Sequence, residues 1–398
     1  MAVQDTAYLM FLPVAEEHRD DPYALYRTLP PVFRSELVQA WVLTKHADVV
    51  AVLSDRTFSA DRTKSERFQG LVPDDFPRSL LGLDPPDHTR LRTLVTKAFT
   101  PRMVEHLRGR IEVLVGQLLD TMEGRNEAEF IEDFAYPLPV NVIAEMLGVP
   151  ASDWELFRGW SKILAASLDP LLPMSQYDEA VKARKALVDY LKVIVAARRS
   201  NPTEDLISGL IAAEERGNMF NDTELLTMLV LLLVAGHETT VNLLGNGLVA
   251  LMRNRGQWER LSAHPELAER AVEELLRYDS PVQLTSRVAT EPRQYCGETI
   301  NEYQTVITLT GAANRDPDVF ADPDRLDLGR QPNPHVAFGR GIHFCLGAPL
   351  ARLEGQIAFN MLARRFPGIE LVGPPVWKPT VVLRGPAKLS VRLPATRD

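Results

Sequence analysis

The 398-residue chain has little cysteine, no excess of basic charge and no long hydrophobic run. Its only cysteines, Cys296 and Cys345, allow at most one bridge, which excludes a disulfide-stabilised secreted fold and fits a reducing cytoplasm. The formal net charge of -9 gives no global attraction for nucleic acid or for an anionic bilayer. We therefore expect no nucleic-acid partner, and small molecules are the favoured ligands.

Two apolar stretches are too short to cross a membrane. The first, residues 7–15, contains Pro13 and lacks a basic leader, so it is not expected to act as an export signal. The second, residues 225–236, ends in the polar sequence HETT and is predicted to lie in a core helix. We expect neither a membrane anchor nor a fused reductase, and a location in the cytoplasm.

Hydrophobic spacing predicts a mainly α-helical protein with small β-sheets. Apolar residues recur at intervals of three and four from about residue 101 to 276, including one helix expected over 103–122. Because repeats and low-complexity linkers are absent, we expect one domain over 1–398, with its helix-rich core at about 85–280 and 340–366. Small β regions are expected near 30–60, 282–312 and 375–394. The strand-like segments are 40–46, 285–290, 303–313, 379–385 and 388–393.

The longest helix is expected from Thr223 to Met252. Asn221 followed by Glu224 resembles an N-terminal capping box. The apolar run of this helix is interrupted by the polar cluster 237–240, which costs stability in a core unless its groups are satisfied or used.

Cys345 lies where a metal-binding thiolate would be favoured. It precedes a predicted helix with Pro349 in its first turn, and the free backbone N–H groups of a helix N-terminus stabilise a thiolate. Gly339, Gly341 and Gly347 would let the backbone turn sharply and let a flat ligand approach. The ordinary alternative is a small buried apolar residue, the role of most free cysteines.

Other motif interpretations fail on individual residues. The loop is not a dinucleotide-binding loop because Phe344 occupies the last glycine position, and HETTV is not a zincin motif because Val241 replaces the second histidine. Zinc-finger spacing is also absent around Cys345, so a metal there needs ligands from elsewhere, which a haem supplies.

The segment FGRGIHFCLG resembles the haem-binding signature of the cytochrome P-450 superfamily. Its matching residues are Phe338, Gly341, His343, Cys345 and Gly347. The resemblance implies the cytochrome P-450 fold, a haem b cofactor (iron protoporphyrin IX) and Cys345 as the axial ligand of its iron. It also implies that Phe338 and Leu346 pack beside the sulfur and the porphyrin.

The cluster AGHETT resembles the oxygen-activation motif of the same family. The resemblance implies that Ala235 and Gly236 leave room for the haem and a diatomic ligand, and that Glu238 and Thr239 relay protons to dioxygen. Asn242 would be a polar neighbour. The alternative is a kink in a core helix, satisfied by threonine hydroxyls bonding to the preceding turn.

Two further residue sets match the family. Glu274 and Arg277 resemble its E-x-x-R pair, and Arg325 is expected to complete a buried structural triad, although Leu326 replaces the usual phenylalanine. The residues expected to hold the haem propionates are His88, Arg92, Arg287 and His343.

The resemblance implies a soluble, bacterial-type haem-thiolate monooxygenase that hydroxylates or epoxidises a hydrophobic small molecule such as a terpenoid, steroid, fatty acid or polyketide. Its electrons would come from a ferredoxin and an NAD(P)H-dependent ferredoxin reductase. The alternatives are a peroxide-using peroxygenase and a non-catalytic haem-based gas sensor. Cys296 has no expected role. The expected ferredoxin-docking residues are Arg102, Arg108, Arg110, Arg340 and Arg352. The expected pocket segments are 61–83, 163–174, the helix near Val234, 282–284 and the turn near Val381.

Overall fold

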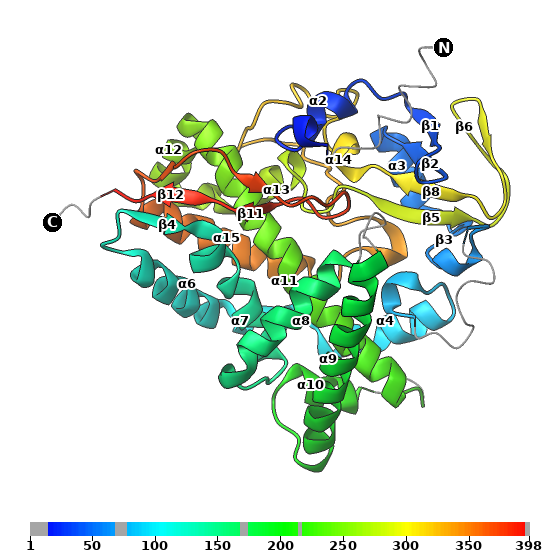
Figure 1. The fold of residues 1–398 in the computed structure, drawn as a ribbon, viewed down its shortest axis with the longest axis horizontal. Coiled ribbons are helices and arrows are strands. Elements are labelled where there is room, and N and C mark those ends of the chain that lie inside the picture. Colours follow the sequence, from blue (N-terminus) through cyan, green and yellow to red (C-terminus); the bar gives the residue numbers. More distant parts are fainter. Residues whose placement is uncertain (1–14, 68–77, 168–173, 214–216, 395–398) are drawn as a thin grey trace.

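A computed structural model describes residues 15–67, 78–167, 174–213 and 217–394, and it confirms a mainly α-helical protein with small β-sheets. The five-stranded sheet occupies the upper right of the view in Figure 1, and helices α6 to α11 fill the centre and lower part.

The long central helix α11 spans Asp222–Arg253, one residue longer at each end than predicted. Its capping box is present, since the Asn221 side chain accepts from the Glu224 N–H at 2.9 Å and the Glu224 carboxylate accepts from the Asn221 N–H at 2.9 Å. By length and composition α11 is apolar enough to cross a membrane, but 67% of its most apolar window is buried inside the protein. That burial is what a core helix shows.

Helices from both halves of the chain pack around α11. They are α7 (Pro137–Met146), α8 (Trp154–Ala166), α9 (Met174–Ser200), α10 (Leu206–Ala212), α12 (Arg255–Ala263), α13 (Ala268–Tyr278) and α15 (Ala348–Arg365). The helix expected over 103–122 is two helices, α5 (Pro101–His106) and α6 (Arg108–Met122), of which α6 packs on α15. The remaining α-helices are α2 (Pro22–Tyr26), α3 (His46–Ser54), α4 (Asp87–Ala98) and α14 (Thr310–Ala313).

The largest sheet has the strand order β1-β2-β8-β5-β3. Its strands are β1 (Val32–Ser35), β2 (Ala40–Leu43), β3 (Phe58–Ser59), β5 (Thr285–Ala289) and β8 (Thr305–Thr308). Only β2 and β8 pair in parallel. The smaller sheets are β4 (Glu127–Glu129) with β12 (Ser390–Arg392) and β9 (Glu370–Leu371), β6 (Arg293–Tyr295) with β7 (Glu298–Ile300), and β10 (Val376–Trp377) with β11 (Pro386–Lys388).

Several of the expected strands are wrong in part. The segment 40–46 is a strand only as far as Leu43, and α3 begins at His46. The segment 303–313 is a strand only as far as Thr308, and α14 follows it. The segment 379–385 forms only an isolated bridge between Leu383 and Val282, because it is the connection of the β10–β11 hairpin, which the Lys378 N–H closes by donating to the Gly385 carbonyl at 3.0 Å.

Candidate functional site

The loop before α15 presents Cys345 at the N-terminal end of that helix. Gly339 and Gly341 have φ values of 71° and 67°, the left-handed region that favours glycine, and a Cβ on Gly341 would lie 2.5 Å from the Leu53 carbonyl oxygen. Gly347 differs, because its φ of -80° suits any residue. A Cβ at that position would lie 4.0 Å from the Cys345 Sγ, so glycine leaves this side of the sulfur uncovered.

The protonation of Cys345 differs from the expectation that the helix N-terminus favours a thiolate. Burial raises the pKa of the Cys345 thiol, and this outweighs the opposing backbone hydrogen bonds of Gly347 and Ala348 and the charges of Arg92 and Arg352. The free protein therefore favours the thiol. A metal bound to the sulfur would remove the proton, as it does from coordinating thiols in general.

Protein side chains alone do not complete a metal site here. Among the residues that the structure describes, no group of three or more histidine, cysteine, aspartate or glutamate side chains could hold a metal ion. A metal at Cys345 must therefore bring its other ligands with it, and a porphyrin does so.

Cys345 lines a cavity of about 360 Å³ that lies between α11, β5 and the loop before α15. The cavity brings together all the predicted site residues except His88, whose ring lies 4.3 Å from that of His343 between centroids. The predicted residues that line it are Arg92, Ala235, Gly236, Glu238, Thr239, Arg287, Phe338, His343, Cys345, Leu346 and Gly347.

Four basic side chains gather beside this cavity and have no acidic hydrogen-bond partner among the described residues: Arg92, Arg287, His88 and His343. Burial lowers the pKa of Arg287 to about 10, with Arg62 adding repulsion, and burial lowers the pKa of His343 to about 3, with repulsion from Arg287 and His88. In the contacts described, Arg92 donates to the Phe344 carbonyl at 2.8 Å. Arg287 donates to the Ser286 carbonyl at 2.8 Å and to the Thr285 hydroxyl at 3.4 Å.

Three buried ring nitrogens in this group also have no partner among the described residues, namely both nitrogens of His88 and Nε2 of His343. Buried polar nitrogens of this kind cost stability unless a ligand satisfies them. The cluster fits an anionic group inserted from the cavity, as the two carboxylates of a haem would be, so the residues present fit that cofactor.

On α11, Thr239 and Glu238 face different surroundings. The Thr239 hydroxyl lies on the cavity side and donates to the Ala235 carbonyl at 3.1 Å, the back-bonding that the alternative interpretation expected. Glu238 is buried and forms an ion pair with Lys378, which also donates to the Asn242 Oδ1 at 2.8 Å. Lys378 was missed by the sequence interpretation because nothing in a surface hairpin marks it.

Gly236 has a second reason to be small. A Cβ there would lie 3.2 Å from the Ile143 Cδ1, so glycine allows α7 to pack against α11. Phe338 lies in the loop before α15, and the Arg352 guanidinium is 4.5 Å from its ring centroid.

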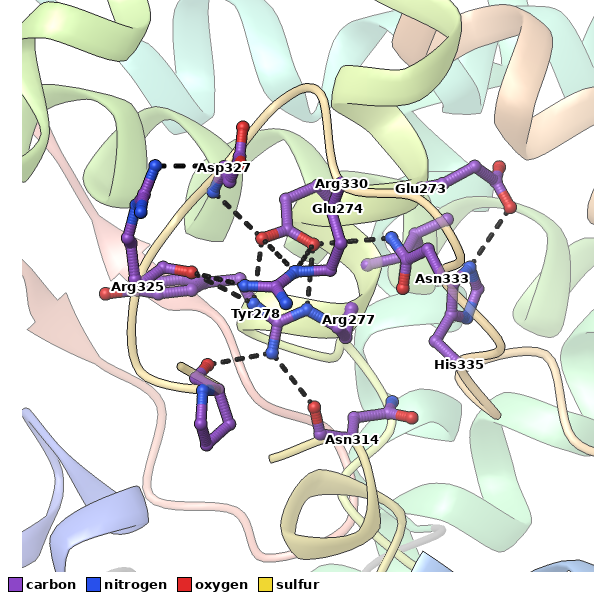
Figure 2. Close-up of polar contacts among 12 residues, drawn as sticks. Glu273, Glu274, Arg277, Tyr278, Asn314, Arg325, Asp327, Arg330, Asn333 and His335 are labelled. Atoms are coloured by element: carbon purple, nitrogen blue, oxygen red, sulfur yellow. Dashed lines mark hydrogen bonds and ion pairs between the residues drawn. The ribbon is translucent and has the colours of Figure 1, made fainter. Parts of the chain in front are cut away.

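The expected triad of Glu274, Arg277 and Arg325 is wrong in its third member. Arg277 donates to both carboxylate oxygens of Glu274 at 2.7 and 2.8 Å, and Arg330 donates to both at 3.1 Å (Figure 2). The Arg325 side chain is 65% exposed, and its backbone oxygen accepts from Arg277 and Arg330 instead. Arg330 lies five positions after Arg325, and spacing alone could not show which arginine the loop turns inwards. Leu326, at the usual phenylalanine position, is buried.

The expected pocket segments contribute unequally. Arg62, Leu80 and Leu81 line the cavity from segment 61–83, of which residues 68–77 lie outside the described residues. The described part of segment 163–174 contributes no lining residue, and residues 168–173 lie outside the described residues. From the turn near Val381, the residues Val382 and Leu383 line the cavity, and Val381 itself is buried in an apolar cluster with Leu284 and Leu309.

Three of the five arginines expected to dock a ferredoxin pair with carboxylates of this chain. Arg108 pairs with Glu105, Arg110 with Glu145 and Arg352 with Glu273. Arg102 and Arg340 are exposed, and the structure gives no ion pair for either within the described residues.

A family model described as cytochrome P-450 matches residues 156–371. The polyketide-biosynthesis cytochrome P-450 PksS of Bacillus subtilis (strain 168) is 42% identical over 97% of this chain and 99% of its own length. The cytochrome P-450 monooxygenase PikC of Streptomyces venezuelae is 39% identical over 95% of this chain and 92% of its own length. Among solved structures, cytochrome P-450 BioI in complex with an acyl carrier protein ligated to hexadec-9Z-enoic acid has a TM-score of 0.89 and 37% identity, covering 95% of this chain and 99% of that one.

Proposed function

The chain belongs to the cytochrome P-450 family, whose members bind haem, and it is a monooxygenase of that family; from this premise we propose that it hydroxylates or epoxidises a hydrophobic small molecule. The observation that carries the proposal is the cavity itself, because Cys345, the cluster of buried basic groups and the Thr239 hydroxyl all face it. The proposed location is the cytoplasm.

Cys345 is the proposed iron ligand of a haem b. When bound, that haem supplies the iron that activates dioxygen, so that one oxygen atom enters the substrate and the other leaves as water. His88, Arg92, Arg287 and His343 would hold its carboxylates. The other contributions would come from small or apolar groups. Ala235 and Gly236 would leave room for the haem, Phe338 and Leu346 would pack beside the sulfur and keep water from it, and Gly347 would leave the haem side of the sulfur open.

Thr239 and Glu238 are the proposed proton-delivery groups. The Thr239 hydroxyl is at the cavity surface and can pass on a proton. Glu238 also lines the cavity and can collect a proton from solvent on the side of the partly exposed Lys378. Each proton that leaves this pair towards the cavity is replaced by one from solvent, so the groups return to their starting state.

Replacing Thr239 with alanine tests the monooxygenase mechanism against the peroxygenase alternative. We expect product formed per electron pair to fall roughly tenfold, with electrons diverted to hydrogen peroxide, because proton delivery would be impaired. T239S keeps the hydroxyl and is the matched control. A T239A enzyme that remains fully coupled, or one that works equally well with peroxide, would favour a peroxygenase.

The proposed substrate is a fatty-acyl or polyketide chain. The cavity lining is largely apolar, with Leu231, Leu232, Val282, Leu284 and Val382 facing it. A relative named for polyketide biosynthesis and a neighbour solved with a fatty-acyl carrier protein support this class, and neighbours solved with testosterone and corticosterone make a steroid the second candidate. Titration of the ferric protein with free and carrier-bound hexadec-9Z-enoic acid is expected to shift its spin state, and a response to steroids or terpenoids alone would contradict the assignment.

The proposed electron donor is a ferredoxin reduced by an NAD(P)H-dependent reductase, docking near Arg102 and Arg340. Arg340 lies in the loop before α15, close in the chain to Ile342 and Phe344, whose side chains are exposed. R102Q and R340Q are expected to slow reduction by about tenfold at low ionic strength, since local charge governs encounter. R110Q is the control, because Glu145 already pairs with Arg110. Reduction rates that do not depend on salt would contradict this docking site.

The gas-sensor alternative requires a protein that binds haem but oxidises nothing. Failure to form product with competent redox partners, together with partner binding that depends on a gas ligand, would favour it.

A further inference from the structure

Lys378 forms a partly buried polar contact with Glu238, one of the two proposed proton-delivery groups. Its ammonium forms an ion pair with the Glu238 carboxylate and donates to the Asn242 Oδ1 at 2.8 Å. Glu238 is 9% exposed at its side chain, whereas Lys378 is 21% exposed. The lysine therefore lies between the buried carboxylate and solvent.

The hairpin that carries Lys378 is packed tightly against α11. A Cβ on Gly385 would lie 2.1 Å from the Asn242 Oδ1, and a Cβ on Gly245 would lie 2.7 Å from the Pro386 Cγ. Two glycines, one on each element, thus allow a backbone approach that larger residues would prevent. This close approach brings the ammonium to Glu238.

The same hairpin is fixed at its base and lines the cavity at its tip. Arg384 donates to the Asp279 Oδ1 at 2.8 Å and stacks 3.9 Å from the Trp377 ring centroid. Val382 and Leu383 face the cavity. The β10–β11 hairpin therefore contacts both the cavity, through Val382 and Leu383, and the Glu238 carboxylate, through Lys378.

The surroundings of Glu238 set its charge. Burial raises the pKa of Glu238, but attraction to Lys378 and to His237, the Lys378 hydrogen bond and the more distant Lys162 bring that pKa below its ordinary value. Burial raises the pKa of the phenol of Tyr136, the N-cap residue of α7, and the charges of Glu238 and Glu155 raise it further.

The His237 ring offers no second permanent cation. It is fully buried, its Nδ1–H donates to the Leu233 carbonyl at 2.8 Å, and its Nε2 accepts from the Ser161 hydroxyl at 2.8 Å. Burial lowers the pKa of His237, so the ring attracts Glu238 only while it carries a proton. Lys378 is thus the charged group in direct contact with Glu238.

We propose that Lys378 is a positioning residue for proton delivery, which holds the Glu238 carboxylate ionised and oriented and so couples the substrate-lining hairpin to oxygen activation. The inference rests on the proposed function, because it requires that Glu238 delivers protons. Lys378 itself transfers no proton and forms no covalent bond in this scheme.

The test compares K378M, K378Q and K378R with K388M, whose lysine is exposed on β11 of the same hairpin. In K378M and K378Q, product per NAD(P)H is expected to fall roughly tenfold and the kinetic solvent isotope effect to rise, with K378R recovering most of the loss and K388M unchanged. K378M and K378Q should also add nothing to E238Q, since a residue that acts through Glu238 has no effect once that carboxylate is gone.

A second readout does not depend on turnover. Without the lysine, burial dominates and the pKa of Glu238 rises, so infrared difference spectra of K378M minus K378M/E238Q should show a protonated carboxyl band at neutral pH that disappears as pH rises. The wild type minus E238Q should lack it. If the wild type forms product but K378M and K378Q match it in coupling and show no such band, the inference fails while the proposed function stands. If the wild type neither binds haem nor forms product, the proposed function itself fails.

Discussion

Replacing Cys345 with serine is expected to abolish the thiolate-type Soret band of the carbon monoxide complex and to lower product formation roughly a thousandfold or more, because electron donation from the thiolate favours O–O bond cleavage. The buried basic groups that would hold the haem carboxylates remain, so C345S should still take up some haem. The ferrous carbon monoxide difference spectrum and product analysis are the measurements.

The control is C296S. Cys296 is exposed in the turn between β6 and β7, and its contact with Asp48 is a long one of 3.9 Å. C296S should keep the wild-type spectrum and activity. A wild-type protein without the thiolate band, or a C345S protein that keeps it, would contradict the assignment of Cys345 as the iron ligand.

The second large effect is expected at Glu274, where alanine should lower the free energy of unfolding by about 3–5 kcal/mol, because it leaves the buried Arg277 and Arg330 without their carboxylate. The substitution also removes the acceptor of the Asp327 N–H, which donates to Glu274 at 2.9 Å. Urea unfolding of the purified protein measures the change.

E274A could prevent the protein from accumulating, and the two nearby arginines then provide a sharper comparison. R330L should cost about 3 kcal/mol, because Glu274 loses one of its two buried cations. R325L should change stability by about 0.5 kcal/mol or less, since its side chain is largely exposed. Equal effects of R325L and R330L would contradict the arrangement in Figure 2.

Interactions between residues that lie close together in the chain can be predicted from the sequence. The capping box at Asn221 and Glu224, helix α11 and the Glu274–Arg277 pair all involve residues within one turn or one continuous helix. The box and the pair are found as predicted, and α11 is one residue longer at each end. The signature around Cys345 is equally local. The structure gathers the distant residues of that prediction around one cavity, although Arg92, Thr239 and Arg287 come from separate elements.

The errors arise where a loop or a hairpin decides which residues meet. Spacing could not choose between Arg325 and Arg330, because that choice depends on how the loop before α15 turns over Glu274. The sequence also could not show the pKa of the metal-free Cys345 thiol. A helix N-terminus is visible in the sequence, but the burial that raises this pKa is a property of the packed protein.

The sequence by itself determined the family, the helical character and the cysteine at the centre of the site, because each depends on residue types at fixed local spacing. Only the tertiary structure decided which charges pair. Glu238 meets Lys378 across 140 positions of the chain, and Glu274 meets Arg330 across 56. Such pairs form because packing removes water from both partners at once. A short stretch of sequence contains only one of the two partners and therefore cannot predict the pair.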